Sequence, residues 1–303
     1  MLDAITFLTA LYVMVDDFCK ANLPAEVRPG PAASLSRAEV VTLALFGQLG
    51  RFASERDFYR FAEQRLRGAF PGLPARSQFN RLVRTHHDAI VAFALSLPER
   101  TDLEALDLSA APVRDRRRRG RSWLVGQADY GHSSREGSFF GFHVLLSVGA
   151  EGDITGFCFG PGSAKEQSMA EAFFALRHTP DPRVPSVGQP SRGEYLGDKG
   201  FAGRHRQVQW QAAYGATLLS LVPSKDRYQL PKAWRQRLAS LRQIVETVYD
   251  KLHHAFRLRR ERPHAVRGFA ARLAAKVGLH NFCLWFNRHL GRPPLAFADL
   301  LGW

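Results

Sequence analysis

Apolar residues recur at helical spacing through the first third of the chain. Residues 2–21 form one such stretch, and Ser36-Arg-Ala-Glu39, just before the next apolar run, has the form of a capping box. Ser54 opens a further helical stretch, and residues 77–97 form another. This pattern predicts that residues 1–98 fold as a helical domain.

Beyond residue 98 the apolar spacing shortens from about 3.6 residues to about 2. The predicted strands are 103–108, 139–148, 154–159, 195–197 and 217–222. Helices are expected at 165–176 and 204–214, and the chain becomes helical again from about residue 231. Three strands followed by alternating helices and strands predict an α/β domain in residues 99–303. Its mixed five-stranded sheet would be flanked by helices, with further helices at the carboxy-terminal end.

The charge of the chain is strongly positive. There are 42 Lys and Arg residues against 28 Asp and Glu, which gives a formal net charge of +14 at pH 7. The hydrophobic fraction of 45% is ordinary for a soluble globular protein, so the sign of the charge is the informative feature. Such an excess of basic residues is typical of proteins that bind a polyanion such as nucleic acid.

Several classes of site are disfavoured by the residues present. Cys19, Cys158 and Cys283 are far apart and form no CxxC pair, which argues against a zinc site or a disulfide framework and favours a reducing cytoplasm. The apolar run 5–15 is too short to span a bilayer and is expected to be a core helix. No Walker loop and no Gly-x-Ser-x-Gly elbow occurs, which argues against an ATPase and a serine hydrolase.

Three carboxylates lie in settings that could bring them together. Asp107 ends the extended run Leu103-Glu-Ala-Leu-Asp-Leu108, and Asp198 follows a second extended run. Glu246 lies beside an apolar helix stripe, on a face that it shares with Arg242 and His253. Oxygen ligands of this kind suit hard divalent cations. A solvated helix face with an Arg242–Glu246 salt bridge of about 0.3–0.5 kcal/mol is the simpler explanation for the Glu246 pattern alone.

The order of these features resembles that of a known family. The chain has a strand aspartate, then a hairpin, then Asp198-Lys-Gly-Phe201 after a later strand, and finally Arg242-Gln-Ile-Val-Glu-Thr-Val248 on a helix. This order resembles that of the DDE transposases of bacterial insertion sequences. Gly141-Phe-His-Val144 and Gly152-Asp-Ile154 are similar to the second and third strands of that family. The resemblance covers residues 100–290. It implies an RNase H-like catalytic domain in residues 99–303, after an amino-terminal domain that binds terminal inverted repeats.

The resemblance also implies a metal-dependent reaction on DNA. Asp107, Asp198 and Glu246 would hold two Mg²⁺ ions, for which Mn²⁺ is expected to substitute. The reaction would cleave a strand of double-stranded DNA at the transposon end, and the freed 3′-hydroxyl would attack target DNA. Pairing of two ends implies a homodimer on DNA. Neither a protein nucleophile, a nucleotide cofactor nor a membrane is required.

The chain departs from the family pattern at several positions. Leu108 separates the first aspartate from Ser109, whereas the family often has Ser or Thr closer. Ala164-Lys165-Glu166 stands where a His-Asp pair is common, and Ala239 and His253 occupy the tyrosine and lysine positions of the Tyr-Arg-Glu-Lys signature.

Alternatives remain open for the first aspartate and for the function. Asp102 or Asp129 would replace Asp107 if the first strand were shifted in register. A metal-dependent DNA nuclease without strand transfer, or a catalytically inactive DNA-binding descendant of a transposase, would show much of the same pattern.

Basic and polar side chains in several regions are expected to contact DNA. The exposed start of the helix at 77–97 carries residue types that bind bases and phosphates. An arginine run follows the first strand, where a solvated loop is the alternative interpretation, and a further basic group accompanies and follows Glu246. The predicted contacts are Arg76, Gln78, Asn80, Arg81, Arg114, Arg116, Arg117, Arg118, Arg119, Arg121, Lys199, Arg242, His253, Arg257, Arg259 and Arg260.

Overall fold

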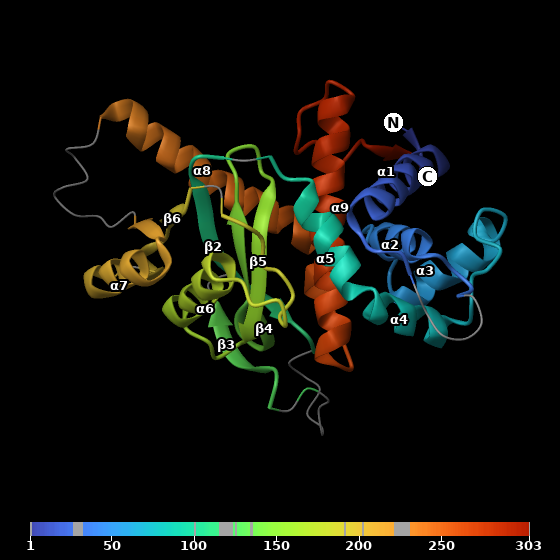
Figure 1. The fold of residues 1–303 in the computed structure, drawn as a ribbon, viewed down its shortest axis with the longest axis horizontal. Helices are drawn as coiled ribbons and strands as arrows, with labels where there is room; N and C mark the ends of the chain where they lie inside the picture. The colour runs from blue at the N-terminus through green and yellow to red at the C-terminus, as the bar shows by residue number, and fades with distance from the viewer. Residues whose placement is uncertain are drawn as a thin grey trace. The chain divides into compact units, whose positions relative to one another are not determined.

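A computed structural model of the chain forms two compact units (Figure 1). It describes residues 2–26, 33–99, 101–114, 124, 126–133, 136–190, 192–201, 203–220 and 231–302. The first unit comprises Met1–Leu97, His254–Arg257 and Ala265–Trp303, and the second comprises Pro98–His253 and Leu258–His264.

The first unit is helical, as the apolar spacing predicts. Its helices are α1 (Ala4–Asn22), α2 (Arg37–Phe46), α3 (Glu55–Phe61), α4 (Arg76–Thr85), α5 (His87–Ser96) and α9 (Val266–His289). The capping box at the start of α2 is confirmed, because Ser36 Oγ accepts from the Glu39 amide at 3.2 Å and the Glu39 carboxylate accepts from the Ser36 amide at 2.6 Å. The two-residue strands β1 (Leu2–Asp3) and β8 (Leu301–Gly302) pair in parallel.

Helix α9 belongs to this helical unit, whereas the sequence pattern assigned all of residues 99–303 to the second domain. The middle of α9 is buried on every side, so the helix needs neighbours all round it. Asn281 Nδ2 donates to the carbonyl of Ala94 in α5 at 2.9 Å, and Arg272 pairs with Glu55 of α3 at 2.8 Å. The compact units therefore differ from the expected domain boundaries.

The second unit is a mixed sheet with helices on both faces. Its strands are β2 (Glu104–Pro112), β3 (Asp129–Ser133), β4 (Gly137–Val148), β5 (Ile154–Pro161), β6 (Glu194–Gly197) and β7 (Thr217–Ser220). β4 pairs antiparallel with β2, β3 and β5, while β6 pairs in parallel with β2 and with β7. The five predicted strands are confirmed, except that residues 221–222 of the last one lie outside the described residues. The short β3, which pairs with the first part of β4, is an addition.

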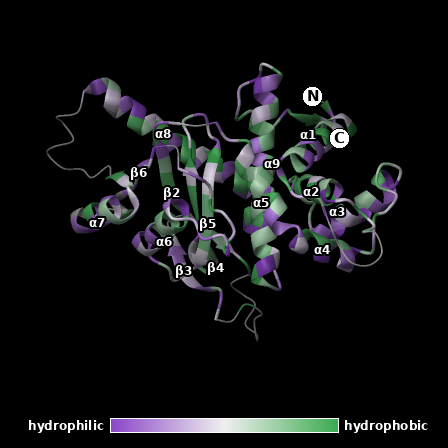
Figure 2. Cartoon of the chain, in the orientation of Figure 1, coloured by the Kyte–Doolittle hydropathy of each residue, from purple (hydrophilic) through white to green (hydrophobic). Residues whose placement is uncertain are grey.

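Helices α6 (Glu166–His178), α7 (Arg204–Tyr214) and α8 (Lys232–Asp250) flank this sheet, and α8 continues into a π-helical turn, Lys251–Ala255. In Figure 1, α6 lies in front of the sheet and α8 runs behind it. One core cluster joins Leu106 and Leu145 of the sheet to Phe173 and Phe174 of α6 and Trp210 of α7. Figure 2 shows that the central strands are largely hydrophobic, whereas the outer end of α8 is hydrophilic.

One edge of β2 opens the space for the candidate site. β2 pairs with β6 only through Glu104–Leu106, which lie opposite Tyr195–Gly197. β6 then ends, and β2 continues to Pro112. Within the part of the chain that the structure describes, no strand pairs with this edge of β2 beyond Leu106. The side chains that follow Leu106 therefore border a gap in the sheet.

Candidate functional site

A cavity of about 910 Å³ lies at this open edge of β2. Residues 105–110 of β2 form one wall, and the first turn of α6, the end of β6 and the middle of α8 form the others. Asp107, Asp198 and Glu246 all line it, although they are far apart in the sequence. The structure therefore brings together the three carboxylates that the sequence singled out.

Strand alternation explains why Asp107 points away from α6 and α7. Leu106 belongs to the core under these helices and Leu108 packs against it, so the side chain between them faces the side of the sheet covered by α8. Tyr249 of α8 fixes this arrangement, because its buried hydroxyl lies 2.8 Å from the carbonyl oxygens of both Asp107 and Val144 and shares its one hydrogen between them. Glu246 lies one helical turn before Tyr249 and so faces the same cavity.

Arg242 links the other two carboxylates. Its guanidinium lies 3.3 Å from Asp198 and 3.8 Å from Glu246. All three side chains are close to half exposed, so these ion pairs contribute little to stability. These ion pairs show instead that Asp198 and Glu246 lie near each other, because one guanidinium contacts both carboxylates.

The electrostatics of Asp107 reflect the same convergence. Burial raises the pKa of Asp107 to about 7, and the negative charges of Asp198, Glu166 and Glu246 add to this effect. The amide of Leu108, which donates to Asp107 Oδ1 at 2.8 Å, acts in the opposite direction on this pKa. Asp107 is therefore affected by three neighbouring carboxylates rather than two.

The additional carboxylate is Glu166, which sequence reasoning treated only as a departure from the family pattern. It is the first residue of α6, it lines the same cavity, and burial followed by the charge of Asp198 raises its pKa. An acidic residue at the start of a helix that follows a strand was the available signal. It was weak, because acidic residues are common at helix starts for reasons of capping and dipole alone.

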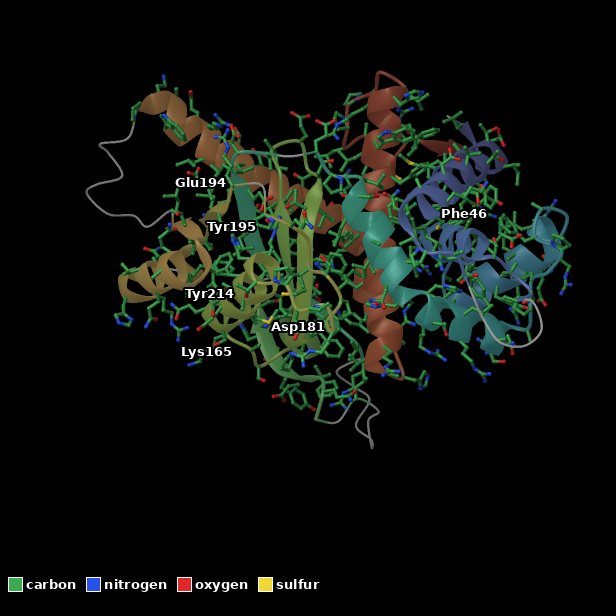
Figure 3. All side chains as sticks on the ribbon, viewed as in Figure 1. Phe46, Lys165, Asp181, Glu194, Tyr195 and Tyr214 are labelled. Carbon is green, nitrogen blue, oxygen red and sulfur yellow. The ribbon has the colours of Figure 1, made fainter. Side chains whose placement is uncertain are left out.

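Two histidines also line the cavity. His132 lies on β3, and the nearly buried His143 lies on β4 with its Nδ1 3.2 Å from the carbonyl oxygen of Ala164. Burial lowers the pKa of His143, so the neutral ring is favoured, with Nδ1–H as the donor to Ala164. This contact holds the segment that leads into Glu166. Figure 3 labels the adjacent Lys165.

The alternative aspartates do not line the cavity. Asp102 is exposed and pairs with Arg192 at 3.2 Å, and Asp129 is exposed on β3. The register of β2 therefore favours Asp107 as the first carboxylate.

The predicted DNA contacts on α4 lie on an accessible face. Arg76, Gln78 and Arg81 are exposed, and Asn80 is half-buried. Phe79 and Val83 of the same helix are buried in the helical unit, so the polar residues face outward.

The structure does not support a DNA contact for His253 or Arg257. His253 is buried, with Nε2 2.9 Å from Ser109 Oγ. Arg257 is also buried, and its guanidinium donates to the carbonyl oxygens of Gly47 and Phe52. Both side chains are buried, and His253 Nε2 and the two Nη atoms of Arg257 contact interior hydroxyl and carbonyl groups rather than solvent.

The remaining predicted contacts differ in what surrounds them. Arg114 lies 4.2 Å from the ring centre of Phe140 and donates to the hydroxyl of Tyr130. Arg259 pairs with Glu136 at 2.6 Å, and Arg260 is exposed. The side chain of Lys199 lies outside the described residues. So do the other members of the arginine run, which are Arg116, Arg117, Arg118, Arg119 and Arg121.

The side chains that line the cavity are of the kind that binds a divalent metal. Across the described ranges, no group of three or more His, Cys, Asp and Glu side chains already has the arrangement of a metal-binding cluster. The chemistry nevertheless fits, because the cavity gathers four carboxylates and their mutual repulsion contributes to the raised pKa of Asp107. Cation binding would relieve that repulsion, after the side chains had turned toward a common centre.

No known protein family, curated protein or solved structure matches the chain. The three cysteines are free, and none of the described helices is long and apolar enough to cross a membrane.

Proposed function

We propose that this chain is a DDE-type transposase that binds the terminal inverted repeats of an insertion sequence and carries out metal-dependent strand cleavage and strand transfer. The observation that carries the proposal is the convergence of Asp107, Asp198 and Glu246 on one cavity. Each comes from a different element, namely a central strand, the segment after a neighbouring strand, and a later helix.

The topology of the second unit supports an RNase H-like catalytic domain. Three antiparallel strands are followed by two parallel strands, in the order β5–β4–β2–β6–β7, with helices on both faces. In this arrangement a carboxylate on β2 and one after β6 lie at the same end of the sheet. The order of strands thus accounts for the position of the cavity.

The four carboxylates supply oxygen ligands, which suit Mg²⁺. Asp107, Asp198 and Glu246 would hold the ions. When bound, Mg²⁺ would supply a more acidic water or 3′-hydroxyl and would neutralise charge on the phosphodiester. The half-exposed Arg242 would then be released from Asp198 and Glu246 to contact a DNA phosphate.

The charge and the helical unit are consistent with DNA as the substrate. The net charge of +14 favours a polyanion, and α4 presents Arg76, Gln78 and Arg81 on one exposed helix. We assign recognition of the terminal repeats to this helix. Two DNA ends must be joined in one complex, so we expect a homodimer on DNA.

The test is a strand-transfer assay with Mg²⁺ on DNA that carries the ends of the element. Joined products support the transposase, free cuts alone support a nuclease, and binding without cleavage supports a non-catalytic DNA-binding protein. Asp107→Ala, Asp198→Ala and Glu246→Ala should each reduce cleavage by more than the ~10–100-fold typical for loss of an outer-shell partner. The matched controls are Asp102→Ala and Asp129→Ala, which should cleave as the wild type does.

A further inference from the structure

We propose that Glu166 is a fourth carboxylate ligand of this cation site, and that Gly200 leaves the space in which the carboxylate of Glu166 lies. The inference rests on the proposed function, since it adds a ligand to the same site. It names a residue that lies outside the triad.

The position of Glu166 is fixed by the packing of α6. Met169, Phe173 and Phe174 of this helix are buried in the core beneath the sheet, so the first turn of α6 cannot shift far from β2. His143 holds the carbonyl of Ala164 just before that turn. Glu166 therefore reaches the cavity from a rigid element.

Gly200 lies directly against the carboxylate of Glu166. A Cβ atom at position 200 would lie 1.0 Å from Glu166 Oε2 and 2.2 Å from its Cδ. Gly200 belongs to the 3₁₀ turn Lys199–Phe201, which follows Asp198, and it is not among the glycines with positive φ. The backbone therefore does not require glycine at this position, but a side chain there could be accommodated only if the Glu166 carboxylate moved.

The charges around Glu166 call for a cation. Glu166 is half-buried, and its side chain has neither a hydrogen bond nor an ion pair with any described side chain or backbone group. Among the described residues, Asp107 accepts from the amide of its neighbour Leu108 alone, while Asp198 and Glu246 share Arg242. A carboxylate that loses water without gaining a partner is costly. A divalent ion near Asp107, Asp198 and Glu166 would remove that cost.

The experiment is a calorimetric titration of the full chain with Mn²⁺ alone, in the absence of DNA. Glu166→Gln removes the negative charge at nearly constant volume and should weaken Mn²⁺ binding at least about tenfold. Glu171→Gln on the same helix is the matched control, because Glu171 is exposed and pairs with Arg206 at 3.0 Å. It should bind Mn²⁺ as the wild type does. Circular dichroism should show the same helix content in all variants.

Gly200→Ala supplies a second, independent measurement. The added methyl group should push the Glu166 carboxylate out of place and weaken Mn²⁺ binding about as much as Glu166→Gln does. In a Glu166→Ala background the methyl group meets no carboxylate, so Gly200→Ala should have no further effect. This non-additivity is the specific signature of contact between the two residues.

The outcomes separate this inference from the proposed function. If the wild type binds Mn²⁺ and Glu246→Gln weakens it but Glu166→Gln does not, Glu166 is not a ligand and the triad stands. If Gly200→Ala weakens binding equally with and without Glu166, the role assigned to Gly200 is wrong. If the wild type does not bind Mn²⁺ at all, both the cation site and the added ligand are refuted.

Discussion

The folded protein disfavours the negative charge of the Asp107 carboxylate. Burial and three neighbouring carboxylates raise its pKa to about 7, from an ordinary value of 3.8. The folded state therefore binds the proton more tightly than the unfolded state does. Between about pH 4 and pH 7 the stability contributed at this position falls as pH rises, and the cost is complete above pH 7.

We therefore expect Asp107→Asn to stabilise the protein in buffer without divalent ions. The gain in free energy of unfolding should be on the order of a few kcal/mol at pH 8 and smaller at pH 5. Urea unfolding at both pH values measures it. The exposed Asp102→Asn serves as the control and should change stability little at either pH. Equal gains for Asp107→Asn at pH 5 and pH 8 would show that its charge is not the cause.

Glu104 and Arg177 form a buried ion pair that the sequence did not reveal. Arg177 Nη1 lies 2.9 Å from Glu104 Oε2, Nη2 lies 3.0 Å from Oε1, and both residues are 2% exposed. Ser147 also donates to Glu104 at 2.7 Å. The pair joins β2 to α6 and so helps to fix the helix that carries Glu166.

Glu104→Ala should cost about 3–5 kcal/mol, because it leaves a buried guanidinium without its counter-charge. The surface pair of Arg183 and Asp181 is the comparison, and Asp181→Ala should lower the free energy of unfolding far less than Glu104→Ala does. Denaturant unfolding of both variants measures the difference. Similar losses for the two would mean that burial does not set the strength of the inner pair.

At the scale of elements, the sequence was informative wherever a strong apolar period coincided with a clear end signal. Helix α7 was predicted with the bounds that it has, and Gly215, with φ of 68°, ends it. The predicted helix at 77–97 is instead two helices that meet at His86, whose φ and ψ are not helical. A single non-helical residue leaves the spacing of the apolar residues nearly unchanged, so this spacing could not reveal the break between the two helices.

The elements that were missed or misjudged depend on tertiary contacts. Strand β3 has the sequence Asp-Tyr-Gly-His-Ser and no apolar alternation, and it is a strand because β4 pairs with it. His253 and Arg257 lie in a basic stretch, and only the fold shows that their polar atoms face inward. The local settings and order of Asp107, Asp198 and Glu246 indicated that they could converge, and they line one cavity, but Glu166 needed the approach of α6 to Gly200.

Helix α4 is the element whose role is most directly testable. We expect Arg81→Ala to weaken binding to the terminal repeat and to reduce the slope of log affinity against log salt by about 1, if the side chain contacts one phosphate. Fluorescence anisotropy across a series of salt concentrations measures both quantities. Arg67, exposed in the same unit and paired with Glu63 at 3.9 Å, supplies the control variant Arg67→Ala. Equal effects of the two variants would indicate general electrostatics rather than recognition by α4.

At the scale of the whole molecule, the chain does not divide into two consecutive domains. After Pro98–His253 it returns to the helical unit at His254–Arg257, contributes Leu258–His264 to the other unit, and ends in the helical unit. Arg257 is part of this return, since its guanidinium binds carbonyl groups at Gly47 and Phe52. The helical unit is therefore completed only by the last part of the chain.

A fragment of residues 1–97 should consequently fail to fold on its own. It would expose the apolar surfaces of α2 and α5 that α9 covers, and it would lack the Asn281–Ala94 and Arg272–Glu55 contacts. The same fragment joined by a flexible linker to residues 265–303 should regain a cooperative thermal transition, because α9 is restored without the second unit. Circular dichroism melts of the two proteins measure this. A cooperative transition in the shorter fragment would show that α9 is an accessory to the helical unit rather than part of its core.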